Sequence, residues 1–203
     1  MNIKAKKIKI KQVKTNKLFV RLLFLISISI LFGVFYMAIL SKSNKNLVGE
    51  ELKTFFSSLN KLSYTKAFID CFIKNSIFLT FVWLLGISII GVPLIILILI
   101  YKSFLLGFSI SSILFFYKWK GILIAVIYCF PLLINLFAFL FLGYYAIIFS
   151  KNLNRLLFLK KEISFHNIMR RYIKMLIFSI ILILIGSLIE IYLVPSLLSL
   201  LKI

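Results

Sequence analysis

Two polar side chains stand inside long apolar runs of this sequence, and they are the first candidates for chemistry. Glu190 lies in ILIGSLIEIYLVP, and Asn135 lies in CFPLLINLF, one turn after Pro131. An ionised carboxylate at the bilayer centre costs roughly 2.5–3.5 kcal/mol or more, so Glu190 is expected to face protein or water, to be protonated or to lie near an interface. Three interpretations stay open: an interfacial residue if Pro195 ends the helix, a structural contact inside a bundle, or part of an ion or proton pathway. Asn135 is expected to form an interhelical hydrogen bond.

The residue combinations that catalysis needs are missing from the sequence. The chain has one histidine, His166, in a polar stretch, and one carboxylate inside an apolar run. A metalloprotease of the membrane needs several such ligands and a general base, and a serine protease needs a serine paired with a buried base. Cys71 and Cys129 form no framework and are interpreted as packing residues. We therefore predict no enzyme, no cofactor and no metal site.

The composition indicates that the segments carrying these residues lie in a membrane. The chain is 63% hydrophobic, with a mean hydropathy of +1.12. Between Ser76 and Phe149 only three residues are charged: Lys102, Lys118 and Lys120. Such a segment is typical of membrane helices. The net charge of +20 does not indicate nucleic-acid binding, because the basic residues are confined to short stretches between apolar runs.

Five apolar runs are candidates for membrane spans. They are Leu22–Leu40, Ser76–Tyr101, Ser103–Tyr117, Gly121–Phe149 and Met175–Leu200. The third measures only about 22 Å as a helix against a hydrocarbon core of roughly 30 Å, so it is either a short span or a re-entrant segment. The first follows 21 residues that carry eight basic side chains and no acid. No convincing cleavage signal follows it, so we expect a retained anchor.

The distribution of basic residues favours five spans over four. With five spans and the N-terminus inside, 16 basic residues lie inside and 9 outside; with four spans the numbers are 12 and 13. We therefore predict an all-α polytopic helical bundle with about five transmembrane helices, a cytoplasmic N-terminus and a C-terminus outside. Its parts are a basic cytoplasmic segment (1–21), a first transmembrane anchor (22–40), an extracytoplasmic amphipathic segment (41–75) and a membrane core of four spans (76–203) with a basic cytoplasmic loop at 150–174.

Residues 47–62, LVGEELKTFFSSLNKL, have the pattern of an amphipathic helix on the outer side. Apolar residues recur at steps of three and four, with charged residues elsewhere. One interpretation is a helix that lies in the membrane interface with its apolar stripe in lipid. The other is a surface that docks a partner protein. The candidates for partner contact are Leu52, Phe55, Phe56 and Leu59.

The position of Lys102 depends on where the chain breaks. If residues 76–101 form one span, Lys102 is a cytoplasmic turn residue whose amine reaches the headgroups. If the chain instead breaks at Gly91-Val92-Pro93, a helix from Pro93 to Tyr117 carries Lys102 to mid-membrane, because proline removes a backbone donor and clashes with the preceding turn. In that case we expect Lys102 to pair with Glu190, since an unpaired charge there is costly.

Three segments give the sequence a family resemblance. WLLGISIIGVPLIILILIYKSFLLGFSI, WKGILIAVIYCFP and the final SLIEIYLVP together resemble stage II sporulation protein M of endospore-forming bacteria, over about residues 71–195. The sequence departs from the family after Pro131, where members carry polar residues and often a second proline, but this chain has Leu132, Leu133 and only Asn135. The most specific matches are Gly86, Gly91 with Pro93, Gly107 with Phe108, Lys120 with Gly121, and Glu190.

The resemblance implies a non-enzymatic role at the cell membrane. Proteins of this family are multi-pass components of a complex with stage II sporulation proteins D and P, which are membrane-anchored peptidoglycan hydrolases. The complex thins septal wall and drives engulfment, on the mother-cell side of the sporulation septum. We therefore expect a scaffold that recruits or holds these hydrolases. The outer amphipathic helix is the expected contact surface.

The alternative is a small membrane transporter or channel subunit. Broken helices and intramembrane carboxylates are used by transport sites, and Glu190 with the Gly91–Pro93 break fits that pattern. The sequence shows no inverted repeat and few polar groups to line a path. It also gives no oligomeric state, since Gly86 and Gly91 are not spaced as a helix-dimer motif.

Overall fold

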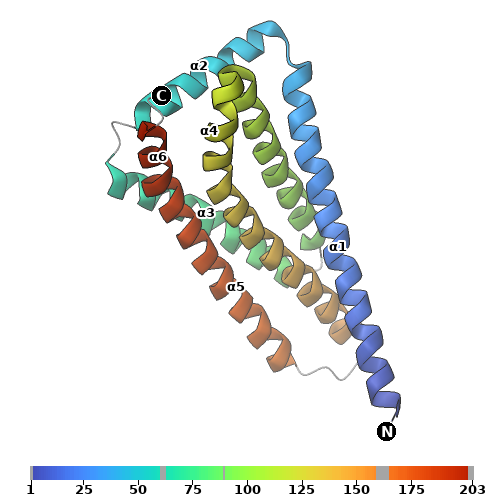
Figure 1. Cartoon of the computed structure of the whole chain (residues 1–203). Helices are drawn as coiled ribbons and strands as arrows, with labels where there is room; N and C mark the ends of the chain where they lie inside the picture. The colour runs from blue at the N-terminus through green and yellow to red at the C-terminus, as the bar shows by residue number, and fades with distance from the viewer. Residues whose placement is uncertain (1, 60–62, 89, 159–164, 201–203) are drawn as a thin grey trace.

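A computed structural model describes residues 2–59, 63–88, 90–158 and 165–200, and these residues form helices joined by short connections (Figure 1). The described part of the chain has no strand, so the predicted all-α class is confirmed. The elements are α1 (Asn2–Ile39), α2 (Lys42–Leu59), α3 (Tyr64–Ile87), α4 (Gly91–Phe158), α5 (Phe165–Leu188), the π-helix η1 (Ile189–Leu193) and α6 (Val194–Leu200).

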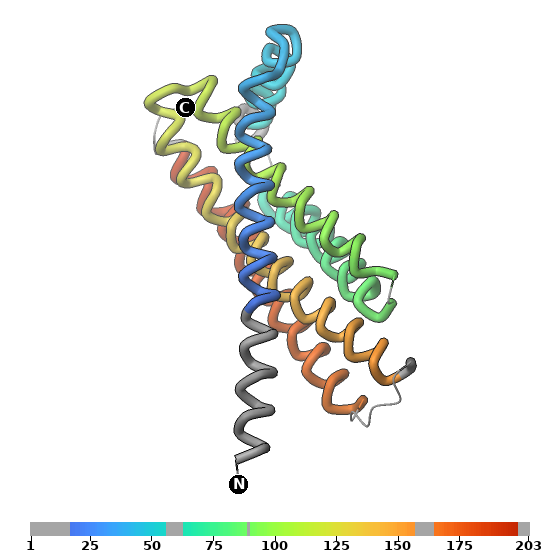
Figure 2. The backbone as a smooth tube through the Cα atoms, turned by 90° about the vertical axis from the view of Figure 1, so that its right-hand side faces the viewer, coloured from blue at the N-terminus to red at the C-terminus, as the bar shows by residue number. Residues whose placement is uncertain are grey.

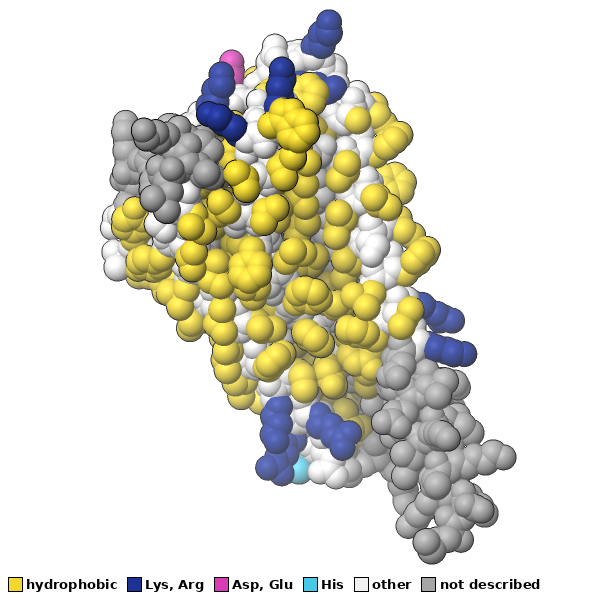
Figure 3. Space-filling view, in the orientation of Figure 1, with side chains coloured by type: hydrophobic (Ala, Val, Ile, Leu, Met, Phe, Trp, Pro, Cys, Tyr) yellow, Lys and Arg dark blue, Asp and Glu magenta, His cyan; other side chains and the backbone are white. Residues whose placement is uncertain are grey.

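Four helical stretches within the described residues are long and apolar enough to cross a membrane. They are Lys17–Ile39, Tyr64–Ile87, Gly91–Leu156 and Phe165–Leu198. The fold is therefore a polytopic helical bundle. Apolar side chains cover its flank, and Lys and Arg gather toward its two ends (Figure 3), as lipid tails and headgroups require. The number of crossings and the side on which each terminus lies stay predictions.

Helix α4 consists of two helices joined at Lys118. A straight helix over the 66 residues of Gly91–Leu156 would measure about 99 Å, three times the hydrocarbon thickness. Lys118 instead has φ 48° and ψ −125°, which is not helical. The chain reverses its direction there (Figure 2). We call residues 91–117 the first half of α4 and residues 119–158 its second half.

The chain breaks between α3 and α4, at Ser88–Gly91. The Ser88 N–H donates to the Leu85 carbonyl (3.1 Å), and the Gly91 N–H donates to the Ser88 carbonyl (3.3 Å). A side chain at Gly91 would collide with the Leu85 carbonyl oxygen. Pro93 lies in the first turn of α4, where a helix does not need its N–H.

This break corrects two of the expected spans. A single helix over Ser76–Tyr101 is wrong, because α3 begins at Tyr64 and ends at Ile87. Residues 103–117 are not a separate short segment; they continue the first half of α4. The alternative with a break at Gly91-Val92-Pro93 is the one that the structure has. Hydropathy alone did not reveal it, because Ser88, Gly91 and their neighbours interrupt the helical backbone without interrupting the apolar run.

The last span also differs from expectation. Helix α5 begins at Phe165, so the apolar run expected from Met175 lies within a longer helix. Pro195 does not end the helix, because α6 continues through it. The Val194 N–H bonds to the Ile189 carbonyl five residues back, which closes the wider π-turn of η1. Proline clashes with the carbonyl four residues before it. For Pro195 that residue is Ile191, which lies within the π-turn.

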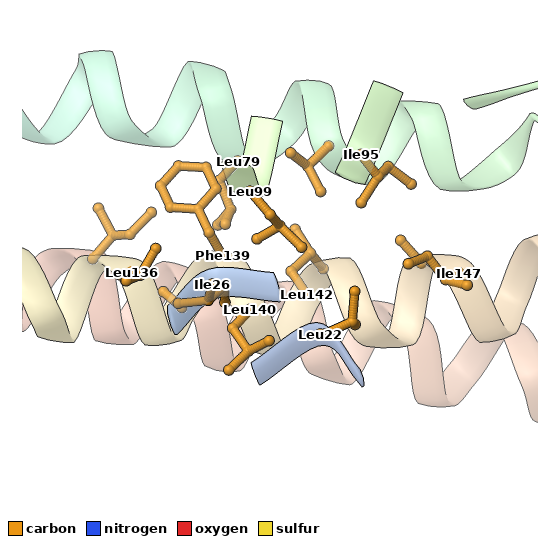
Figure 4. Packing of buried hydrophobic residues seen from close by; sticks show 14 of the residues in the cluster. Leu22, Ile26, Leu79, Ile95, Leu99, Leu136, Phe139, Leu140, Leu142 and Ile147 are labelled. Atoms are coloured by element: carbon orange, nitrogen blue, oxygen red, sulfur yellow. The ribbon is translucent and has the colours of Figure 1, made fainter. Parts of the chain in front are cut away.

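The core lies where α1, α3, α5 and both halves of α4 meet. Its fully buried side chains include Leu79, Leu99, Phe139 and Leu142. They converge from three helical segments (Figure 4). A smaller cluster near α2 and α6 contains Ile113, Ile124 and Val194. The polar residues described next lie between these two apolar clusters.

Candidate functional site

Lys102 lies inside the bundle, on the first half of α4. Its side chain is half-buried, and its Nζ lies 4.8 Å from the ring centroid of Phe78 and 4.9 Å from that of Phe139. Nζ also donates to Asn75 Oδ1 (3.3 Å). The two aromatic faces attract the ammonium group. The interpretation of Lys102 as a turn residue is therefore wrong, because α4 runs through it.

Glu190 faces the same interior from η1. Its Oε2 accepts a hydrogen bond from Asn135 Nδ2 on the second half of α4 (3.5 Å). The Cys71 thiol on α3 can donate either to this oxygen (3.5 Å) or to Ser187 Oγ (3.7 Å). The carboxylate therefore makes contacts inside the bundle.

Asn75 and Cys71 connect the two charges. Asn75 accepts from Lys102 and donates through Nδ2 to Cys71 Sγ (3.7 Å), whose thiol reaches Glu190. The chain Lys102–Asn75–Cys71–Glu190–Asn135 therefore joins α3, both halves of α4 and η1. We call it the polar network. Within the described residues no direct ion pair links Lys102 to Glu190, so the expected pairing is replaced by a bridge of two uncharged side chains.

Both charges line a cavity of about 270 Å³. Asn75, Asn135, Ser109 and Tyr128 also line it, together with apolar side chains of α4. The cavity walls contain one positive and one negative group, so a neutral site results. Opposite charges held together are the arrangement in which ionised groups are tolerated inside a membrane protein.

The glycines that the sequence singled out lie at close contacts. A side chain at Gly86 would meet the Tyr172 hydroxyl and the Ala146 side chain, and one at Gly107 would meet the Ile30 carbonyl. The Tyr172 hydroxyl donates to the Trp83 carbonyl (2.7 Å). These positions bring helices together and lie outside the polar network.

Phe108 and Pro131 support the same packing from within α4. The Phe108 ring lies 6.1 Å from that of Tyr36 on α1 and 6.4 Å from that of Phe104. Pro131 is buried inside the second half of α4, four residues before Asn135. Neither residue lines the polar cavity.

The apolar stripe of α2 packs on the chain itself. Leu52 contacts the smaller core cluster, and the Phe55 ring stands edge-on to that of Tyr128 at 5.7 Å. A side chain at Gly49 would meet the Phe116 ring. The backbones of Phe56 and Leu59 belong to α2, but their side chains lie outside the part that the structure describes. Leu52 and Phe55 therefore hold α2 against α4, and less of their surface is available to a partner protein.

Sequence reasoning missed three members of the site: Cys71, Asn75 and Ser187. The first two were assigned to the outer segment 41–75. A signal existed: if α3 ends near Gly91, a helix long enough to span must begin near residue 64, and this places Cys71 and Asn75 in the membrane.

The arrangement supports binding more than catalysis. No group of three metal-ligating side chains occurs among the residues that the structure describes. The polar network offers an ammonium, a carboxylate and two amides around one cavity, and the Cys71 thiol lies behind them. These groups can hold a polar ligand or fix helices relative to one another.

Comparison with known proteins gives one match. The family model described as stage II sporulation protein M matches residues 22–195. The matched region includes all of α3, α4, α5 and η1, and therefore the whole polar network. No curated protein and no solved structure matches the chain.

Proposed function

Because this chain belongs to the stage II sporulation protein M family, we propose that it is a membrane scaffold that recruits or holds peptidoglycan hydrolases at the sporulation septum. Family membership makes it a sporulation-related membrane protein. The proposed partners are stage II sporulation proteins D and P, and the proposed place is the mother-cell side of the septum. There it would contribute to thinning of the septal wall and to engulfment.

The observation that carries this proposal is the end of the bundle formed by α2 and the Lys118 turn. Positive-inside counting predicts that this end lies outside the cell, where wall hydrolases act. Trp119 is 86% exposed there, the highest value among the large apolar side chains whose burial is described. Lys118 and Lys120 flank it and are exposed as well. An exposed tryptophan with basic neighbours is a common anchor of protein contacts.

Helix α2 gives this end a defined shape. It lies across the end of the bundle (Figure 1), with Phe55 against Tyr128 and Lys45 Nζ 5.1 Å from the Phe115 ring centroid. We therefore assign the partner contact to the Lys118 turn with Trp119 and assign α2 a positioning role. A scaffold of this kind acts by raising the local concentration of anchored enzymes, and it needs no catalytic group.

Affinity capture of the tagged full chain from sporulating cells tests the proposal. Both hydrolases should be recovered with the unaltered chain, and Trp119→Glu should reduce their recovery several-fold and delay engulfment. Ile90→Glu is the matched control, because Ile90 is 82% exposed at the turn between α3 and α4, which lies away from the Lys118 turn (Figure 2). Recovery of neither hydrolase with the unaltered chain would contradict the scaffold role.

A transporter is the second candidate, because the polar cavity holds two charged groups inside the bundle. The apolar packing beside the cavity argues against it, because Leu79, Leu99 and Leu142 are fully buried in the core cluster. Flux of a solute into liposomes that contain the pure protein would favour the transporter over the scaffold.

A further inference from the structure

A second cavity lies beneath α2, next to the polar cavity. The second one has a volume of about 410 Å³, and both are lined by Ser109 and Tyr128. We call the 270 Å³ space the inner cavity and the 410 Å³ space the outer cavity. Because they share these two residues, they adjoin between the two halves of α4. Together they fall in the range of roughly 300–1,000 Å³ that is typical of small-molecule sites.

The walls of the two cavities differ in chemistry. The outer cavity is lined mainly by apolar side chains, including Val48, Leu52 and Phe55 of α2. The exposed Glu51 also lines it, so it reaches the surface at α2. The inner cavity contains Lys102 and Glu190. The two cavities therefore place an apolar lining beside two charges of opposite sign.

The groups around the inner cavity have unused hydrogen-bonding capacity. Lys102 has three N–H donors and makes one hydrogen bond, to Asn75. Glu190 accepts through Oε2 only, and in the described part of the chain Oε1 has no partner. Asn135 Oδ1 is buried and has no partner either. Unused N–H donors therefore remain on Lys102, and an unused acceptor oxygen remains on Glu190.

Apolar packing adjoins the inner cavity. One turn from Lys102, Leu99 is fully buried, and Leu79 and Leu142 are fully buried in the same cluster. They belong to the close-packed core of Figure 4. The polar end of the site is therefore held by a rigid apolar core.

We propose that the two cavities form a binding site for a small zwitterion with an apolar side chain, of the size and chemistry of a leucine-like α-amino acid. The carboxylate lies at Lys102, and the ammonium lies at Glu190. The apolar side chain lies in the outer cavity against Leu52 and Phe55, with α2 as the cover. The site does not depend on the scaffold role.

The charge balance of the site explains why a zwitterion is preferred. A ligand with both charges leaves the pocket neutral and gives each buried charge a partner. A ligand with a single charge leaves an uncompensated charge in a region of low dielectric, which is strongly unfavourable. Hydrogen bonds to charged groups contribute about 1.5–3 kcal/mol each, which corresponds to at least a tenfold change in affinity.

Binding of L-leucine to the full chain in lipid nanodiscs, measured by calorimetry, tests the proposal. We expect saturable binding, with at least about tenfold weaker binding of 4-methylpentanoate, which lacks the ammonium, and of 3-methylbutylamine, which lacks the carboxylate. Glycine should bind more weakly than leucine because it leaves the outer cavity unused. Equal binding of the amine alone would make this a cation site and overturn the proposal.

Substitutions test whether leucine binds at Lys102 and Glu190, and whether a loss of binding is only a loss of folding. Lys102→Met and Glu190→Gln should each weaken leucine binding at least about tenfold. The double variant has no unpaired charge, so it should fold and still fail to bind. Lys53→Met and Glu50→Gln are the matched controls on the exposed face of α2 and should bind as the unaltered chain does. No leucine binding by the unaltered chain, or normal binding by the double variant, would overturn the proposal.

Discussion

Gly33 of α1 and Gly107 of α4 lie where the backbones of the two helices touch. A side chain at Gly33 would collide with the Phe104 carbonyl oxygen, and one at Gly107 would collide with the Ile30 carbonyl oxygen. Close by, Ser111 Oγ donates to the Val34 carbonyl (3.3 Å). Small residues that let backbones approach are the usual basis of helix association in membranes. Helix α1 is therefore an integral part of the bundle.

Enlarging either glycine at this crossing is expected to destabilise the protein. Gly33→Leu and Gly107→Leu should each lower the free energy of unfolding by about 1–3 kcal/mol or more, because a backbone carbonyl cannot move aside as a side chain can. Thermal unfolding in detergent measures the change. Gly143→Ala is the control, since its methyl group would meet only the flexible Leu99 and Ile95 side chains at 3.2 and 3.3 Å. Equal losses at all three positions would contradict the backbone contact.

Gly86 and Tyr172 are expected to be energetically coupled. Tyr172→Phe removes the hydrogen bond to the Trp83 carbonyl and should lower stability by about 1 kcal/mol. Gly86→Ala should lower it further, because its methyl group meets the Tyr172 hydroxyl. The double variant should lose less than the two single losses combined, since removal of the hydroxyl makes room for the methyl group. A double-mutant cycle measures this, with Tyr145→Phe as the control, and strict additivity would argue against the contact.

The charges at Lys102 and Glu190 are expected to depend on each other. Lys102→Met and Glu190→Gln each leave one charge in the interior and should each lower the free energy of unfolding by roughly 2.5–3.5 kcal/mol. The double variant should lose less than either single variant, because no isolated charge remains. Chemical denaturation in detergent micelles measures these values. A double variant less stable than both single variants would show that the two groups act independently.

Lys118 is expected to be replaceable by glycine with a gain in stability. Its φ of 48° and ψ of −125° match the first central position of a type II′ turn, which favours glycine. Lys118→Gly should therefore raise the free energy of unfolding by about 0.5–1 kcal/mol, since a side chain at positive φ is strained. Lys120→Gly, two residues later in the helix, should lower it by a similar amount. If Lys118→Gly lowers stability as Lys120→Gly does, Lys118 does not have the positive φ of the structure.

The sequence was sufficient to predict the helical bundle and its amphipathic outer helix. Hydropathy marked the apolar runs, and the spacing of apolar residues in 47–62 agrees with α2. The reversal at Lys118 also falls in the short gap left between two expected spans, 103–117 and 121–149. These features depend on local composition, which a sequence records directly.

The helix boundaries around residue 90 were not predictable from hydropathy. Ser88 to Pro93 are apolar or small, so the run looks continuous from Ser76 to Tyr101. The break depends on how the Leu85 and Ser88 carbonyls are bonded, which is a property of the backbone. The resulting shift of α3 moved Cys71 and Asn75 from the outer segment into the membrane.

The candidate site was predictable only in part. Lys102, Asn135 and Glu190 attracted attention because charged and amide groups are rare in apolar runs. Their bridge passes through Cys71, a residue that sequence reasoning treats as a small apolar one. Only the folded chain brings α3, both halves of α4 and η1 together around one cavity.

The π-turn at Ile189–Leu193 adds one residue to what is otherwise an α-helix. Each residue of an α-helix turns its side chain by about 100°, so a chain without this extra residue would present its carboxylate to lipid instead of to Asn135. Deleting Leu188 would rotate the preceding face of α5 relative to Glu190 and leave composition and hydropathy almost unchanged. In an alignment of relatives, a one-residue gap in this short stretch would therefore separate chains that can build the polar network from chains that cannot.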